Sequence, residues 1–163
     1  MIEIPLTRGL FAKIDDDDLP LVLGRAWSAH DGQRTTYARA ALARKSGKSP
    51  RVYMHRVIIG AAPGVEVDHI NGDGLDNRRA NLRIATRSQN LGNMSKPSTG
   101  KSSQYKGVTW LPNRKKWAAR IRNNGRTRHL GVFLSELDAA RAYDLAAKER
   151  FGEFARLNFE VKR

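Results

Sequence analysis

The sequence predicts an α+β chain built from small antiparallel sheets and a few helices. Short runs such as residues 65–70 alternate apolar and polar side chains, which is the pattern of half-buried strands. The residues at 123–125, Asn-Asn-Gly, separate two further such runs and favour a hairpin turn. Ser135, with Asp138 three residues later, is typical of a helix N-terminus. A chain of 163 residues has room for one ordinary domain or for two or three small ones.

The first part, residues 1–50, is predicted to be a β-rich unit. Four adjacent aspartates at 15–18 suggest a metal site, but a solvated turn that caps the next helix is the favoured interpretation. Trp27 and Tyr37 are expected to anchor the core of this unit, because large aromatic side chains contribute most to a small core. The expected elements are strands at 2–4 and 10–14 and a short helix at 19–27.

The second part, residues 51–95, is expected to fold as strand, loop, strand and helix. Its first strand covers residues 65–70, and a loop rich in Gly, Asp and Asn follows it at 71–77. The second strand is expected at 81–85. Thr86 and Gln89 form a capping-box pattern, which predicts a helix at 87–94.

Residues 96–104 are polar and rich in Pro, Gly and Ser, so we expect them to be a flexible linker. The last part, residues 105–163, is predicted to be a three-stranded antiparallel sheet packed on one helix. Repeated alanines in that helix suggest that it lies close against the sheet. The expected elements are strands at 105–110, 117–122 and 126–133 and a helix at 135–151.

The net charge of +14 calls for a polyanionic partner, either nucleic acid or an anionic membrane surface. Residues 96–163 hold 16 basic and 6 acidic side chains and so carry most of this excess. No apolar run approaches the ~20 residues that a bilayer span needs, and no secretion signal is expected at the N-terminus. The chain has no cysteine, which excludes disulfides and cysteine-bound zinc. A protein that merely coats RNA or DNA would show the same charge.

Asp68 and His69 are the first candidates for chemistry. A phosphodiesterase needs a base that activates water and a cation that neutralises charge developing on phosphate. A neutral His suits the first role, and a carboxylate such as Asp68 is a hard-oxygen ligand for Mg²⁺. Asn90 could present an amide oxygen to the same ion, and Asn81 could orient the His69 ring. By spacing alone, an adjacent Asp-His pair is more often structural than catalytic.

The string VDHINGDGLDNRRANLRIATRSQN, residues 67–90, closely resembles the HNH endonucleases of the His-Me finger superfamily, in the homing-type branch of phages and introns. This resemblance implies a ββα-metal nuclease unit over residues 51–95. It further implies His69 as general base, Asn81 as its support, and Asp68 and Asn90 as ligands of one Mg²⁺ or Mn²⁺ ion. The last position of the motif is Asn90 in this chain rather than His, a variant that this branch of the family tolerates.

Several basic side chains near this string are candidates for accessory roles. His55 matches a recurring upstream position of the family, and a structural or phosphate-contacting role is favoured over catalysis. Arg83 and Arg87 could hold flanking DNA phosphates. For either arginine taken alone, a solvated surface position is the favoured interpretation.

The central strand of the C-terminal part has two unlike faces. Trp117, Ala119 and Ile121 share one face, while Arg120 and Arg122 share the other. We expect the apolar face to pack on the helix and the arginine face to point outward. A sheet of this kind can enter the major groove, where arginine pairs with guanine. A basic solvated face is the alternative.

Residues 105–159, from YKGVTW to FARLNF, resemble the ethylene-response-factor (Apetala-two) type DNA-binding domain of plants. The resemblance implies a sheet that lies in the major groove. Thr127 and His129 stand where plant members usually carry Arg and Trp, so the plant recognition sequence is not transferred. Arg128 falls on the side that faces the helix, which is unexplained unless its stem reaches the sheet edge. The candidate DNA contacts are Lys116, Arg120, Arg122, Thr127 and His129.

These observations predict a metal-dependent DNA endonuclease with a preference for a long, asymmetric site. Double-stranded DNA is the expected partner. We expect a monomer without a membrane or an obligate protein partner, acting in the cytoplasm of a host cell and encoded by a phage or mobile element. One alternative is a sequence-specific DNA-binding regulator that keeps an inactive nuclease unit. Another is an RNA-binding or structural protein.

Overall fold

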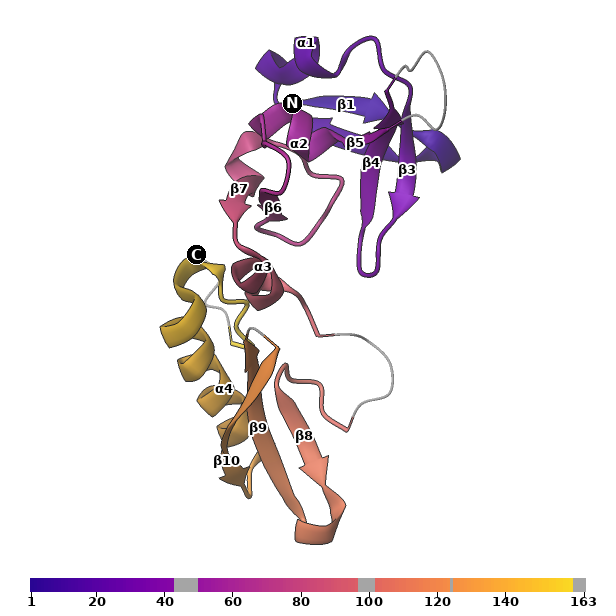
Figure 1. The fold of residues 1–163 in the computed structure, drawn as a ribbon. Helices are drawn as coiled ribbons and strands as arrows, with labels where there is room; N and C mark the ends of the chain where they lie inside the picture. Colours follow the sequence, from indigo (N-terminus) through magenta and orange to yellow (C-terminus); the bar gives the residue numbers. More distant parts are fainter. Residues whose placement is uncertain (43–49, 97–101, 124, 160–163) are drawn as a thin grey trace. The chain divides into compact units, whose positions relative to one another are not determined.

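A computed structural model describes residues 1–42, 50–96, 102–123 and 125–159, and confirms the α+β class (Figure 1). The chain forms two compact units, Met1–Thr86 and Arg87–Arg163. The expected linker at 96–104 falls in large part on residues 97–101, which lie outside the described residues. The expected four-part division, with boundaries after residues 50, 95 and 104, stays a prediction.

The first unit contains three small antiparallel sheets. The predicted strands at 10–14, 65–70 and 81–85 are present, each one or two residues shorter than expected. The sheets pair β1 (Ile2–Pro5) with β2 (Phe11–Ile14), then β3 (Trp27–Asp31) with β4 (Thr36–Ala41) and β5 (Arg51–Tyr53), and then β6 (Glu66–His69) with β7 (Leu82–Ala85).

The predicted helix at 19–27 is correct only at its start. Helix α1 covers Leu19–Val22, and Gly24, with a positive φ of 74°, turns the chain away from helical geometry. Trp27 instead opens β3, where it is buried and its indole nitrogen donates to the Val22 carbonyl at 2.9 Å. Trp27 is therefore part of the core, as expected, but it reaches the core from a strand.

One hydrophobic core joins residues from both halves of the first unit. Ile14 and Trp27 come from the N-terminal strands, whereas Met54 and Ile58 come from helix α2 (Met54–Ile59) and Leu82 from β7. The N-terminal strands therefore pack directly on the elements that carry Asp68 and His69.

The aspartate turn at 15–18 is structural, but the expectation that it stays solvated is wrong for Asp18. Asp18 is 1% exposed, and its carboxylate accepts hydrogen bonds from Arg79 at 2.6 and 2.9 Å. Asp15 accepts from the Arg79 backbone N–H at 2.8 Å. A buried carboxylate needs such a partner, so this ion pair holds η3 (Arg79–Asn81) against the N-terminal strands.

The second unit has the predicted three strands and long helix. Strands β8 (Val108–Leu111), β9 (Lys116–Asn123) and β10 (Arg126–Phe133) form a sheet with β9 at its centre, and α4 (Glu136–Phe151) lies along this sheet (Figure 1). Ser135 caps α4 by accepting from the Asp138 N–H. Three alanines of α4 are fully buried, which confirms the close helix–sheet packing: Ala139, Ala140 and Ala147.

Helix α3 (Arg87–Asn93) also belongs to the second unit. Its Gly92 lies so close to Phe151 that an added Cβ would come within 2.7 Å of the ring. The Gly92 carbonyl also accepts from the Arg156 N–H at 3.2 Å. Among the described residues, no helix combines the length and the apolar character that crossing a membrane requires.

Candidate active site and nucleic-acid interface

His69 is the last residue of β6 and is 6% exposed. Antiparallel pairing with β7 places it opposite Leu82, and Asp68 opposite Arg83. Its Nε2 lies 3.4 Å from the side-chain oxygen Oδ1 of Asn77. The candidate base is therefore held at the point where the strand ends and the loop at 70–78 begins.

The hydrogen bonds of Asn77 assign the tautomer of His69. The Asn77 amide nitrogen donates to the Leu75 carbonyl at 3.1 Å, which directs Oδ1 toward the His69 ring. An amide oxygen only accepts, so Nε2 of His69 must carry the proton. The lone pair that could take a proton from water is then on Nδ1.

Burial lowers the pKa of His69 below its ordinary value, although the hydrogen bond with Asn77 and the charges of Asp68 and nearby aspartates act in the opposite direction. The neutral imidazole is consequently the form present at neutral pH. A neutral imidazole is the state that a general base requires.

The side chain of Asn81 forms its hydrogen bonds with the loop that follows His69. Its Oδ1 accepts from the Asn71 N–H at 3.0 Å, and its amide nitrogen donates to the Asp76 carbonyl at 2.7 Å. Its backbone carbonyl also accepts from the Ile70 N–H at 2.9 Å. These contacts fix the shape of the loop, and the predicted support of His69 by Asn81 stays a prediction.

Asp76 ties the same loop from within. It is 4% exposed and accepts from Arg78 at 2.7 Å and from the Asn71 amide at 2.9 Å. The Arg78 hydrogen bonds lower the pKa of Asp76, so that its carboxylate stays ionised.

The N-terminal strands hold the outer side of this loop. In β2, the backbone N–H of Lys13 donates to the Leu75 carbonyl at 2.8 Å, and the Lys13 carbonyl accepts from the Asn77 N–H at 2.7 Å. Thr35 accepts from the Gly74 N–H at 2.9 Å. Gly74 itself lies against Tyr37 and the Thr36 carbonyl so tightly that no Cβ fits there. Asn77, Thr35 and Tyr37 were not identified from the sequence, because only the fold brings β2 and the β3–β4 hairpin to the loop.

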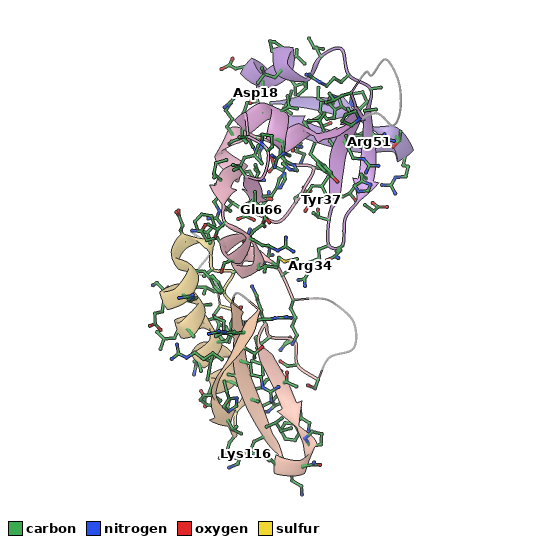
Figure 2. All side chains as sticks on the ribbon, viewed as in Figure 1. Asp18, Arg34, Tyr37, Arg51, Glu66 and Lys116 are labelled. Atoms are coloured by element: carbon green, nitrogen blue, oxygen red, sulfur yellow. The ribbon has the colours of Figure 1, made fainter. Side chains whose placement is uncertain are left out.

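Aromatic rings surround His69 on one side. The ring centroids of His55 and Tyr37 lie 4.9 and 5.8 Å from that of His69, and Tyr53 stacks on His55 at 5.5 Å (Tyr37 is labelled in Figure 2). His55 is 8% exposed, and its Nδ1 has no hydrogen-bond partner among the described residues. Burial, followed by the charges of His69 and Arg56, lowers the pKa of His55 to about 3. This packing favours a structural role for His55.

Asp68 is 4% exposed and forms an ion pair with Arg83. The guanidinium Nη2 and Nε lie 2.8 and 2.9 Å from the same carboxylate oxygen, Oδ2. The residue expected to bind metal and one expected to contact phosphate therefore neutralise each other in this structure. Because a buried carboxylate needs a positively charged partner, the position beside Asp68 must hold a cation, which in this structure is the Arg83 guanidinium.

The other two candidates from residues 67–90 lie on α3. Asn90 and Arg87 are placed with the second unit, and their predicted roles as metal ligand and phosphate contact stay predictions. The described residues contain no group of three or more His, Cys, Asp or Glu side chains suited to a metal. The candidate donors Asp68 and Asn90 offer only oxygen, which fits Mg²⁺ or Mn²⁺ completed by water and phosphate, and does not fit zinc.

The candidate DNA contacts of the second unit share one face of its sheet. In the β9–β10 register, Arg120 lies opposite His129 and Arg122 opposite Thr127, so the two pairs project on the same side. All four are exposed, as is Lys116 at the tip of the β8–β9 hairpin (Figure 2). Ala119 and Ile121 are buried on the opposite, helix-facing side, as expected. The exposed residues Lys116, Arg120, Arg122, Thr127 and His129, three of which are basic, are called the basic strip below.

Comparison with known proteins gives two kinds of likeness. A family model described as HNH endonuclease matches residues 52–91. An HNH endonuclease of Acanthamoeba polyphaga mimivirus is 32% identical over 158 residues, which cover 93% of this chain and 76% of that protein. Protein 3.8 of Escherichia phage T7 is 31% identical over 98 residues, or 57% of this chain and 75% of that protein.

The second likeness is to plant proteins and is partial. The dehydration-responsive element-binding protein 2A of Oryza sativa subsp. indica is 48% identical over 60 residues, which cover 34% of this chain and 20% of that protein. The viral relative, by contrast, matches along nearly the whole chain.

Proposed function

Because the chain belongs to the HNH endonuclease family, we propose that it hydrolyses phosphodiester bonds of duplex DNA with His69 as the general base. The observation that carries this proposal is the hydrogen bond between His69 Nε2 and Asn77 Oδ1. That contact keeps the proton on Nε2 and leaves the lone pair on Nδ1. Burial keeps the ring neutral at the same time.

In the proposed reaction, Nδ1 of His69 takes a proton from a water molecule while the water oxygen forms a bond to phosphorus. The bond between phosphorus and the departing 3′-oxygen breaks, and this oxygen takes a proton from a solvent water molecule, which leaves a 5′-phosphate and a 3′-hydroxyl. The proton held by His69 is then released to solvent. Such a base contributes about 10²–10⁴-fold to the rate. Asn81 and Asn77 act as positioning residues, because they hold the loop and the ring rather than the reacting atoms.

We further propose that Asp68 and Asn90 hold one Mg²⁺ or Mn²⁺ ion. When bound, such an ion stabilises the charge that develops on the phosphate and on the departing oxygen. Arg83 occupies one oxygen of Asp68, so ion binding requires that Arg83 share the carboxylate or turn away from it. An Arg83 side chain released in this way would be placed to contact a phosphate, as Arg87 would on α3.

The second unit is proposed to bind duplex DNA through the strip of Lys116, Arg120, Arg122, Thr127 and His129. The partial likeness to plant element-binding proteins supports this assignment, as does the shared outward face of the five side chains. Two unlike DNA-binding units would give a monomer a long, asymmetric footprint and hence the site preference of a homing-type enzyme. The viral relatives support an origin in a phage or mobile element, acting in the cytoplasm of its host.

Incubation of the full chain with supercoiled plasmid and Mg²⁺ tests the proposal. We expect relaxed or linear product, loss of product with EDTA, and a rate at least about 10²-fold lower for His69→Ala. His129→Ala is the matched control for the chemistry, since it changes an exposed histidine of the second unit and should alter binding but not the cleavage rate at saturating enzyme.

Two results would contradict parts of this assignment. Cleavage that persists both in EDTA and in the His69→Ala variant would refute the proposed role of the metal ion and the proposed role of His69 as base. Tight, sequence-specific retention of DNA without any cleavage would favour a DNA-binding regulator with an inactive nuclease unit.

A further inference from the structure

A hollow of about 660 Å³ lies in the second unit on the side of the sheet that faces α4. Two of its strand residues, Arg126 and Arg128, have the parity of buried Ile121, which lies directly opposite Arg128 in the β9–β10 register, and so project on the opposite side from Arg120 and Arg122. Thr127 belongs both to the basic strip and to the lining of the hollow. Its lining residues are Ile121, Arg126, Thr127, Arg128, Ala146, Glu149 and Arg150.

The hollow exists because a small side chain meets long ones at this end of the unit. Nearer the start of α4, Ala139 and Ala140 are fully buried in the core with Val108 and Ala119 of the sheet, whereas Ala146 lines the hollow together with Arg126 and Arg128. Arginine stems separate their charged heads from the apolar floor and direct them to the rim. This placement explains why an arginine, Arg128, occupies a position on the helix-facing side of the strand.

The charge around the hollow is not balanced by the protein. Three guanidinium groups and one carboxylate line it, and among the described residues none of the four groups forms an ion pair. Like charges gathered at one place repel one another unless an anion lies between them. Five other arginines in the part of the chain that the structure describes form ion pairs with aspartates, among them Arg79 with Asp18 and Arg141 with Asp138.

We propose that this hollow binds phosphate groups. Guanidinium groups present planar pairs of N–H donors that match phosphate oxygens, and three of them around one space favour a tetrahedral anion over a single carboxylate. The excess of two positive charges matches one phosphate monoester or two neighbouring phosphodiesters. The phosphates come either from a DNA strand passing behind the sheet or from a free phosphorylated ligand.

The inference does not depend on nuclease activity. It is tested on the full chain carrying His69→Ala, which prevents cleavage during binding measurements. In the first arm, the affinity for duplex DNA is measured against salt concentration with and without Arg126→Gln plus Arg128→Gln. In the second arm, binding of inorganic pyrophosphate to the same proteins is measured by calorimetry without DNA.

If the phosphates belong to DNA, the double variant should lower the salt slope by about 1 to 2, since each phosphate contact contributes about 0.9 to it. If they belong to a free ligand, pyrophosphate should bind to the parent protein at least about tenfold more tightly than to the double variant, with the DNA slope unchanged. Glu149→Gln should strengthen binding in the same arm, because it removes the one carboxylate of the hollow.

Arg141→Gln is the matched control. Arg141 is an exposed arginine of α4 that pairs with Asp138 outside the hollow, so its loss should leave both measurements near those of the parent. The proposal is overturned if the double variant matches Arg141→Gln in both arms, or if Glu149→Gln weakens binding. If the parent protein does not retain duplex DNA at all, the proposed DNA-binding function fails and the pyrophosphate arm alone decides about the hollow.

Discussion

Acidification should destabilise the first unit through His55. The ring is buried against His69 and Tyr37, and its Nδ1 has no hydrogen-bond partner in the part of the chain that the structure describes. Burial lowers its pKa to about 3 from an ordinary value of 6.5. The unfolded chain therefore takes up a proton at a higher pH than the folded protein does. The stability contributed by neutral His55 is fully present above pH 6.5 and is lost progressively as the pH falls toward 3.

The size of the effect follows from these two pKa values. Between about pH 7.5 and about pH 4.5, His55 alone should remove about 3 kcal/mol from the free energy of unfolding. That loss is a large fraction of the ~5–15 kcal/mol that holds a typical domain together. His69, whose pKa is also lowered by burial, should add to it in the same direction.

Urea unfolding at the two pH values, in buffer with EDTA, measures this difference for the parent protein and for His55→Gln. The variant has no ionisable group at this position, so it should lose about 3 kcal/mol less than the parent on acidification. His129→Gln, which removes an exposed histidine, should behave as the parent. Equal losses for His55→Gln and the parent would refute the claim that burial holds His55 neutral.

Three further predictions concern the site. Gly74→Ala should lower the free energy of unfolding in urea by about 1–3 kcal/mol and the rate of plasmid cleavage by about 10²-fold. The added Cβ would lie 2.5 Å from a carbonyl oxygen and displace the loop that holds His69. An unchanged cleavage rate would disprove the positioning role of this loop. The cleavage rate should rise with pH through a midpoint below 6.5 and then level off, since burial favours the neutral base; a midpoint at or above 6.5 would argue against His69 as that base. In EDTA, Arg83→Ala should lower the free energy of unfolding by about 3 kcal/mol, because it leaves buried Asp68 without its ion-pair partner. Added Mg²⁺ should restore part of this loss. If Mg²⁺ does not raise the thermal unfolding temperature of this variant, Asp68 is not a ligand of the ion.

Much of the local structure could be predicted from the sequence. Alternation with period two located β1, β2, β6, β7 and the three strands of the second unit, but not β3, β4 or β5. The register of β9 and β10 confirms that Arg120 and Arg122 share one exposed face. The Ser135 cap and the alanine-rich face of α4 were likewise predictable. These features depend on residues near one another in the chain. The helix at 19–27 failed because burial of Trp27 in the core outweighed its local helical pattern.

What the tertiary structure decided is how distant segments complete the site. The sequence alone determined that His69 stands at the end of a strand, before a polar loop, in a string typical of HNH endonucleases. Only the fold showed that Asn77 assigns its tautomer, that the rings of Tyr37 and His55 lie against it, and that Arg83 forms an ion pair with Asp68. Such contacts depend on loop conformations and on the packing of separate sheets, which no periodicity records. For the same reason, the exposed arginines at the back of the C-terminal sheet gained a physical explanation only when α4 was placed opposite them.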